Sequence, residues 1–196
     1  MAKIGIFGGS FNPIHLGHIG ICRDILEKKM VDEIWLMVSP QNPLKPSSVL
    51  IDEGLRLKLA KEATKSIKNI KVSDFEFSLP RPSYTYDTLS RLSVEYPKDS
   101  FSLIIGADNW YNFKKWYRYS EILMNYNIIV FPRKDFPLKS ENVYKHPNVT
   151  FLDSKIFPFS STEVRAYLSQ GKSIENIVPQ EITNELLHMY PNTAST

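Results

Sequence analysis

The chain has 196 residues, of which 42% are hydrophobic and 23% are charged. This composition excludes wholesale disorder, and no apolar stretch approaches the length of a membrane span. The formal net charge is only +3, and basic residues are interspersed with acidic ones, which disfavours nucleic-acid binding and favours a small anionic ligand. We expect one cytoplasmic α/β domain over residues 1–191, followed by a frayed tail at 192–196.

The first predicted element is a strand over 4–7, and a histidine-bearing loop follows it directly. The loop reads Gly8-Gly9-Ser10-Phe11-Asn12-Pro13-Ile14-His15-Leu16-Gly17-His18. Glycines let the backbone turn sharply and approach a ligand, and a helix beginning near His18 would aim its unpaired N–H groups and positive dipole end at an anion. His15 and His18 would share one face of the first helical turn. This order of elements predicts a phosphate site.

Plainer interpretations of this loop stay open. A glycine pair after a strand is often only a turn, a histidine is often structural, and the H-x-x-H spacing can hold a metal. A structural zinc site is disfavoured because the only cysteine, Cys22, lies on the following helix and no second Cys/His pair stands at ligand spacing. We interpret Cys22 as a small helix residue in a reducing compartment rather than as a nucleophile.

Strands and helices alternate along the rest of the chain. Short apolar runs predict extended segments over 4–7, 33–38, 70–72, 75–77, 100–106, 127–131 and 149–152. Helical spacing of apolar residues predicts helices over about 16–29, from Asp52 through Ala63, 84–96, 160–170 and 179–190. This alternation predicts a doubly wound parallel sheet of about five or six strands.

Two of the predicted strands end at charged side chains. The strand over 100–106 leads into Asp108, and the strand over 127–131 leads into Arg133. Ligands bind at the carboxyl edge of open parallel sheets, so we expect the carboxylate and the guanidinium on that rim. The charged, proline-containing segment 134–147 is expected to be a surface excursion.

A second candidate anion site reads Ser160-Ser161-Thr162-Glu163-Val164-Arg165. Ser160 and Glu163 match the S-x-x-E capping box, so the plainer interpretation is a well-capped helix. The cap does not require Arg165, which lies a little over one turn into the helix, near the hydroxyls of Ser161 and Thr162. Hydroxyls, amide groups and a guanidinium at one helix end form a cradle for an anion.

With both motifs in place, the chain resembles the bacterial nicotinate mononucleotide adenylyltransferases, which belong to the nucleotidyltransferase superfamily with HxGH and SSTxxR-type signatures. The resemblance covers nearly the whole chain and implies a single Rossmann-like domain with a small helical part at about 158–191. Three further segments match the pyridine-nucleotide branch: Asn42-Pro43-Leu44-Lys45, Ser83-Tyr84-Thr85-Tyr86-Asp87-Thr88, and Gly106-Ala107-Asp108 followed by Trp116.

The resemblance implies that ATP and nicotinate mononucleotide are joined to give deamido-NAD and pyrophosphate in NAD biosynthesis. Mg²⁺ would be held by the phosphates, with no metal site on the protein. Alternatives left open are nicotinamide mononucleotide as substrate, phosphopantetheine adenylyl transfer, a glycerol-phosphate cytidylyltransferase, and a nucleotide sensor without turnover. Whether the chain forms a homo-oligomer is also left open.

The resemblance also assigns site residues. Those expected to bind ATP are Gly8, Gly9, Ser10, Phe11, His15, His18, Gly106, Asp108, Arg133, Ser160, Ser161, Thr162 and Arg165. Those expected to bind the mononucleotide are Ser10, Phe11, Lys45, Thr85, Tyr86, Asp108, Trp116 and Tyr117. Among them, His15, His18 and Arg165 are the expected catalytic groups. Trp116 would stack on the pyridine ring, while packing within the aromatic cluster around Trp110 remains its alternative role.

Overall fold

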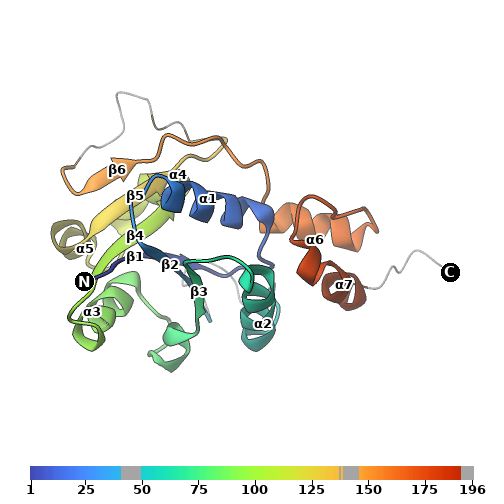
Figure 1. Cartoon of the computed structure of the whole chain (residues 1–196), viewed down its shortest axis with the longest axis horizontal. Helices are drawn as coiled ribbons and strands as arrows, with labels where there is room; N and C mark the ends of the chain where they lie inside the picture. Colours follow the sequence, from blue (N-terminus) through green and yellow to red (C-terminus); the bar gives the residue numbers. More distant parts are fainter. Residues whose placement is uncertain (41–49, 137, 139–145, 191–196) are drawn as a thin grey trace.

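The computed structural model describes residues 1–40, 50–136, 138 and 146–190. The strands in these ranges are β1 (Lys3–Gly9), β2 (Glu33–Val38), β3 (Ile70–Ser73), β4 (Ser100–Gly106), β5 (Asn127–Phe131) and β6 (Val149–Phe151). They form one sheet in the order β3-β2-β1-β4-β5-β6, and every neighbouring pair is parallel. This confirms the predicted doubly wound parallel sheet (Figure 1).

The helices alternate with the strands as expected. In the described ranges they are α1 (Leu16–Glu27), α2 (Glu53–Thr64), α3 (Thr85–Glu95), α4 (Ala107–Tyr111), α5 (Tyr119–Asn125), α6 (Ser161–Ser169) and α7 (Gln180–Met189), with short 3-10 helices η2 (Phe75–Ser78) and η3 (Phe113–Lys115). Asp52 caps α2 as predicted, because its Oδ1 accepts a hydrogen bond from the Leu55 N–H at 3.0 Å. No helix in the part of the chain described here is long and apolar enough to cross a membrane.

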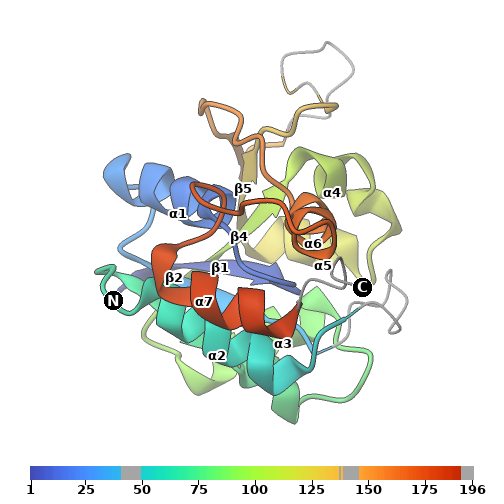
Figure 2. The same cartoon turned by 90° about the vertical axis from the view of Figure 1, so that its right-hand side faces the viewer.

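Helices cover both faces of the sheet, so the strands are apolar on both sides. One core joins α1 and α2 on one face of the sheet with α6 and α7 beyond its end (Figure 1), through residues such as Ile25, Leu59, Val164 and Leu186. The other packs α3, α4 and α5 against the opposite face, with Leu92, Trp110 and Ile122 among its members. Figure 2 shows α1 on one side of the strands and α4 and α5 on the other.

The segment 75–77 is not extended, and this sequence prediction is wrong. The chain leaves the sheet at Ser73 and forms η2, in which the Phe77 N–H donates to the Asp74 carbonyl oxygen at 2.8 Å. Phe75 packs against the core on one face of the sheet and Phe77 against the core on the other. An apolar residue at every second position is also the pattern of a strand. Here it arises because the chain passes the edge of the sheet and the two phenylalanines pack on opposite faces.

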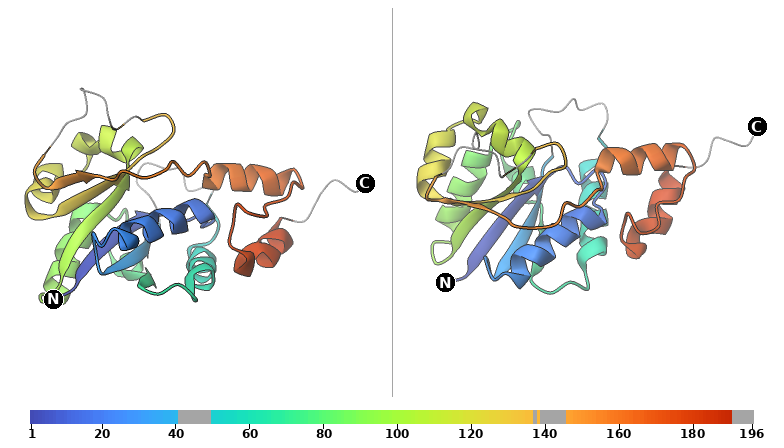
Figure 3. Two further views of the ribbon diagram at one scale, coloured as in Figure 1. Left: turned by 45° about the horizontal axis from the view of Figure 1, so that its top comes forward. Right: turned by 90° about the horizontal axis from the view of Figure 1, so that it is seen from above.

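The site lies where the strand order reverses. β1 pairs with β2 on one side and with β4 on the other, and in such sheets the crevice outside the carboxyl ends of these strands binds the ligand. All six strands of the described sheet point toward the end of the molecule that carries α6 and α7 (Figures 1 and 2). The chain reaches that end by a segment that runs from β6 along α1 into α6 (Figure 3).

Candidate active site

The glycine loop after β1 turns at a different place from the one expected. Gly8 and Gly9 are the last residues of β1, and the backbone turns at Phe11, whose φ is 42°. A Cβ placed on Gly8 would meet no atom within 4 Å, whereas one on Gly9 would lie 3.1 Å from the Phe11 ring. The predicted sharp glycine turn is therefore wrong, but open space lies in front of Gly8.

The two histidines lie face to face at the start of α1. His15 is the N-cap residue, and its backbone N–H donates to Nδ1 of His18 at 3.2 Å. The two imidazole rings stack with their centroids 3.7 Å apart. The His18 ring also packs edge-on against Phe11, at 5.0 Å between centroids. Backbone capping and ring stacking thus hold both imidazoles in fixed orientations at the carboxyl edge of the sheet.

The His15 imidazole is neutral at physiological pH. Burial, with the positive charge of Arg133 as a second cause, lowers its pKa from 6.5 to about 3. Its Nδ1 atom is buried without a hydrogen-bond partner among the described residues. A Cβ on Gly17 would lie 2.9 Å from this atom, so glycine at that position leaves room for the ring. A neutral imidazole with an unpaired nitrogen suits hydrogen bonding to a phosphoryl oxygen better than ion pairing.

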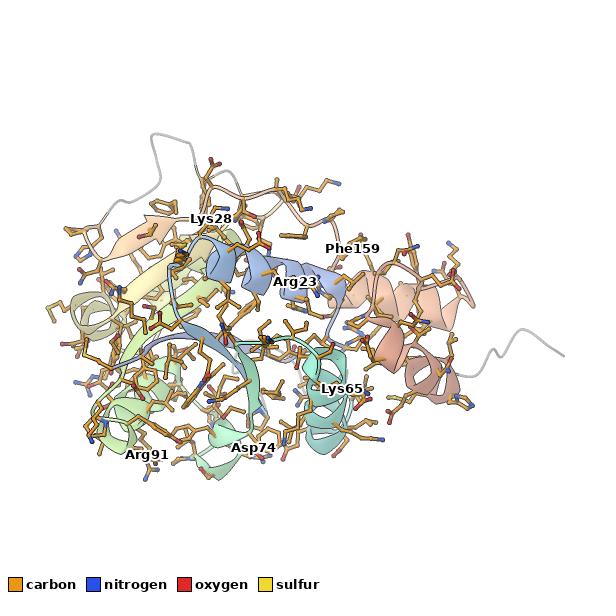
Figure 4. All side chains as sticks on the ribbon, viewed as in Figure 1. Arg23, Lys28, Lys65, Asp74, Arg91 and Phe159 are labelled. Carbon is orange, nitrogen blue, oxygen red and sulfur yellow. The ribbon has the colours of Figure 1, made fainter. Side chains whose placement is uncertain are left out.

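The second predicted anion element is docked onto the first. Ser160 caps α6, because its Oγ accepts from the Glu163 N–H at 3.2 Å. The Ser161 hydroxyl donates to the Pro13 carbonyl oxygen at 2.9 Å. Arg165 donates from Nη1 to the Asn12 carbonyl oxygen at 2.8 Å and from Nη2 to Oγ1 of Thr162 at 3.3 Å. The entry to α6, where Phe159 is labelled in Figure 4, lies beside the start of α1.

Asp108 and Arg133 meet on the rim, although they follow different strands. Asp108 lies in the first turn of α4 after β4, and its Oδ1 forms an ion pair with Nε of Arg133 at 3.6 Å. A Cβ on Gly106 would lie 2.3 Å from that Oδ1 and 3.0 Å from that Nε, so the pair depends on this glycine. The positive charge of Arg133 also contributes to the lowered pKa of His15.

The residues expected to bind the mononucleotide lie at the start of α3 and around Tyr117, and these two segments are in contact. Thr85 begins α3, and the rings of Tyr84 and Tyr86 lie 4.9 Å and 6.3 Å from that of Tyr117. The Arg118 guanidinium covers the Tyr86 ring at 4.0 Å from its centroid. Lys45 and the rest of its motif lie outside the described residues.

Trp116 shows the packing that was its alternative role, and its stacking on the pyridine ring stays a prediction. The side chain is half-buried and packs against Phe113, with ring centroids 5.4 Å apart. Its Nε1 is buried and has no hydrogen-bond partner in the described ranges. Trp110, by contrast, is buried in the core, as its packing interpretation predicted.

Two buried charged residues at this edge were not predicted. Arg56 is 1% exposed on α2, and Glu76 is 8% exposed on η2. Arg56 stands three residues before Leu59, on the buried stripe of α2. An arginine at a core position of a helix is unusual, and this signal could have identified Arg56 from the sequence. Glu76 carries no comparable signal, because its partners come from other parts of the chain.

Cys22 is buried in α1, and burial raises the pKa of its thiol. A thiol of this kind is not a ready nucleophile, which agrees with its interpretation as a small helix residue. No described groups of three or more His, Cys, Asp or Glu residues could hold a metal ion.

Comparison with known proteins agrees with this geometry. The cytidylyltransferase-like family model matches residues 6–167. A probable nicotinate-nucleotide adenylyltransferase of Bacteroides fragilis is 46% identical, over 88% of this chain and 85% of its own length. A probable nicotinate-nucleotide adenylyltransferase of Flavobacterium johnsoniae is 40% identical, over 95% of this chain and 96% of its own length. The fold matches that of Plasmodium falciparum nicotinic acid mononucleotide adenylyltransferase complexed with NaAD, at a TM-score of 0.82 and 20% identity over 97% of this chain and 98% of that one. The chain belongs to the cytidylyltransferase-like family, in the group of the nicotinate-nucleotide adenylyltransferases.

Proposed function

We propose that this protein transfers the adenylyl group of ATP to nicotinate mononucleotide, giving deamido-NAD and pyrophosphate in NAD biosynthesis in the cytoplasm. The observation that carries the proposal is the docking of α6 on the histidine loop. Arg165 and Ser161 donate hydrogen bonds to the carbonyl oxygens of Asn12 and Pro13. These hydrogen bonds bring two candidate anion-binding elements from distant parts of the chain side by side, which supports the proposal because a triphosphate needs several such groups. The similarity to named adenylyltransferases supports the choice of reaction.

In the proposed reaction a phosphate oxygen of the mononucleotide attacks the α-phosphorus of ATP. The new P–O bond forms as the bond from the α-phosphorus to the bridging oxygen breaks, and pyrophosphate leaves with that electron pair. The attacking phosphate is largely ionised near pH 7, so neither a general base nor a protein nucleophile is needed. Positioning the two substrates in line and stabilising the developing charge supply most of the barrier reduction.

The proposed roles of the side chains follow from their chemistry. The neutral His15 and its stacked neighbour His18 would donate hydrogen bonds to phosphoryl oxygens. Arg165, with the hydroxyls of Ser161 and Thr162, would contact the triphosphate from the α6 side. Asp108 would accept hydrogen bonds from ribose hydroxyls, and Trp116 would stack on the pyridine ring.

Mg²⁺ would be bound mainly by the phosphates of ATP. This ion prefers oxygen ligands and commonly uses one or two carboxylates together with substrate phosphates. Asp108 is the carboxylate on the rim, and it is paired with Arg133 at 3.6 Å. When bound, the ion would neutralise charge on the β- and γ-phosphates of ATP as pyrophosphate leaves.

The test is pyrophosphate release by the purified protein with ATP and Mg²⁺. Separate reactions receive nicotinate mononucleotide, nicotinamide mononucleotide or phosphopantetheine, and a further one receives CTP with glycerol phosphate. We expect pyrophosphate release with both pyridine mononucleotides, and a lower KM for nicotinate mononucleotide than for nicotinamide mononucleotide. Activity confined to phosphopantetheine or to glycerol phosphate would assign the chain to another branch. A protein that binds ATP but releases no pyrophosphate with any acceptor would be a sensor.

A further inference from the structure

Two buried charges lie behind the candidate site, outside the groups that face the substrates. Arg56 and Glu76 come from α2 and η2, and neither has an ion-pair partner among the described salt bridges within 4.0 Å. A buried charge of this kind is costly unless it is fully hydrogen-bonded. Both residues make several hydrogen bonds at the carboxyl edge of the sheet.

Arg56 ties three backbone segments together. Its Nη1 donates to the carbonyl oxygens of Ser10 at 2.6 Å and Ser39 at 2.8 Å. Its Nη2 donates to the Pro40 carbonyl oxygen at 3.0 Å, and its Nε donates to that of Ile51 at 2.9 Å. The guanidinium thereby fixes the start of the glycine loop against the segment that follows β2.

Glu76 ties a different pair of segments. Its carboxylate accepts hydrogen bonds from the Ser83 hydroxyl and from the Thr88 hydroxyl, each at 3.0 Å. The Ser39 side chain is a third hydrogen-bond partner. Burial raises the pKa of Glu76, while these three hydroxyl donors favour its ionised form. Ser83 and Thr88 flank Thr85 and Tyr86, which are expected at the mononucleotide.

Ser39 joins the two buried charges. Its backbone N–H donates to the Gly9 carbonyl oxygen at 2.9 Å, its own carbonyl accepts from Arg56, and its side chain contacts Glu76. A continuous hydrogen-bonded chain therefore runs from the glycine loop, through Ser39 and Glu76, to the segment 83–88.

We propose that Glu76 is a positioning residue for the mononucleotide, because it sets the segment 83–88 at a fixed distance from the glycine loop. Glu76 touches neither substrate in this proposal and acts through Ser83 and Thr88. The inference rests on the proposed function, since it concerns the second substrate of that reaction. Loss of the carboxylate leaves three hydroxyls to find other partners, and the segment that they anchor then loosens.

The experiment measures KM for nicotinate mononucleotide and for ATP separately in folded variants. Glu76→Leu removes the acceptor, Glu76→Gln keeps its shape and one oxygen, and Ser83→Ala removes one of the three bonds. Ser93→Ala is the matched control, because Ser93 lies on α3 and bonds to Leu89 and Tyr126 instead. Binding of nicotinate mononucleotide alone, followed by calorimetry, adds a readout that does not depend on turnover.

We expect Glu76→Leu to raise the KM for the mononucleotide by roughly tenfold or more, with KM for ATP and kcat within about twofold. Glu76→Gln should recover much of this loss, Ser83→Ala should show a smaller shift in the same direction, and Ser93→Ala should show none. If Glu76→Leu does not fold, the inference is tested by comparing the KM for nicotinate mononucleotide of Ser83→Ala with that of Ser93→Ala.

Two results would overturn the inference. One is an unchanged mononucleotide KM in folded Glu76→Leu and Ser83→Ala. The other is a parallel rise of both KM values, which would make Glu76 a structural residue only. A wild-type protein that releases no pyrophosphate from ATP when nicotinate mononucleotide is the acceptor overturns the proposed function, and this inference with it. An active wild type with unaffected variants overturns the inference alone.

Discussion

At the scale of single residues, the buried His15 makes stability depend on pH. Its pKa lies near 3 in the folded chain and near 6.5 in a free imidazole, so the unfolded chain binds an additional proton between these values. Stability from this group is therefore complete above pH 6.5 and falls as the pH is lowered toward 3. The slope approaches about 1.4 kcal/mol per pH unit for one proton.

His15→Gln should remove this slope. We expect the free energy of unfolding of the wild type to fall more steeply than that of the variant between pH 7 and pH 5, as measured by urea titration. The raised pKa of Glu76 acts in the opposite direction, but it is present in both proteins and cancels in the comparison. His188→Gln, at an exposed position on α7, is the control. Parallel profiles for wild type and His15→Gln would contradict the neutral, buried state of His15.

His18 should matter for turnover more than for binding. A hydrogen bond aimed at charge that develops in the transition state affects kcat, and losing one such donor costs on the order of 3 to 4 kcal/mol, or about 10²- to 10³-fold. We expect His18→Ala to lower kcat by this order and to change the KM for nicotinate mononucleotide by much less. Equal and small effects on both constants would assign His18 to packing against Phe11 and Phe7.

At the scale of elements, the alternation of strands and helices was predictable from apolar spacing, and so were the caps at Asp52 and Ser160. These features depend on neighbours in the sequence, which is why local patterns predict them. The short helices α4 and α5 were not predicted, because an aromatic-rich segment of this length lacks a clear helical period. α5 also begins after Arg118, whose left-handed φ of 52° no local pattern indicated.

The packing of α1 against the segment leading to α6 depends on Gly20. A Cβ on Gly20 would lie 2.2 Å from the Phe157 ring, so this ring has to move if the residue becomes alanine. An alanine normally stabilises a helix interior by about 1 kcal/mol over glycine. We expect Gly20→Ala instead to destabilise the protein by roughly 1 to 3 kcal/mol, measured by urea unfolding.

Gly54→Ala on α2 is the matched control for Gly20→Ala. Within 4 Å, a Cβ there would meet only Oδ1 of Asp52, at 3.2 Å. We expect this variant to be neutral or slightly stabilised. Adding Phe157→Ala to Gly20→Ala should cost less than the sum of the two single changes. Additive costs would show that the ring and Gly20 do not pack together.

At the scale of the whole molecule, α6 and α7 share a core with β1 and α1. Leu186 is fully buried in that core, and the Leu16 N–H at the start of α1 donates to the Ile177 carbonyl oxygen at 2.9 Å. We expect Leu186→Ala to lower the free energy of unfolding by about 2 to 5 kcal/mol, in a single transition by both fluorescence and circular dichroism. Its neighbour Leu187 is 47% exposed, and Leu187→Ala should change stability by about 0.5 kcal/mol or less. Two separate transitions would mean that α6 and α7 unfold independently.

The arrangement of the elements in space was less predictable than the elements themselves. Apolar strands carry no mark of which strand lies beside them, so the order β3-β2-β1-β4-β5-β6 required the structure. The same holds for Glu76, because its contacts with Ser39, Ser83 and Thr88 depend on how the end of β2 and the start of α3 meet η2. The two candidate phosphate motifs could be proposed from the sequence because each is contiguous in it.

The bond between Arg165 and Asn12 spans 153 positions of the chain, and this separation has a consequence for synthesis. The histidine loop leaves the ribosome among the first residues, and its partner helix follows only after most of the chain has been made. At about 5 to 20 residues per second, the loop waits roughly 8 to 30 seconds for Arg165. A truncated or unfinished chain therefore lacks one of the two proposed phosphate-binding elements, and we expect a nascent chain to acquire affinity for ATP only near the end of translation.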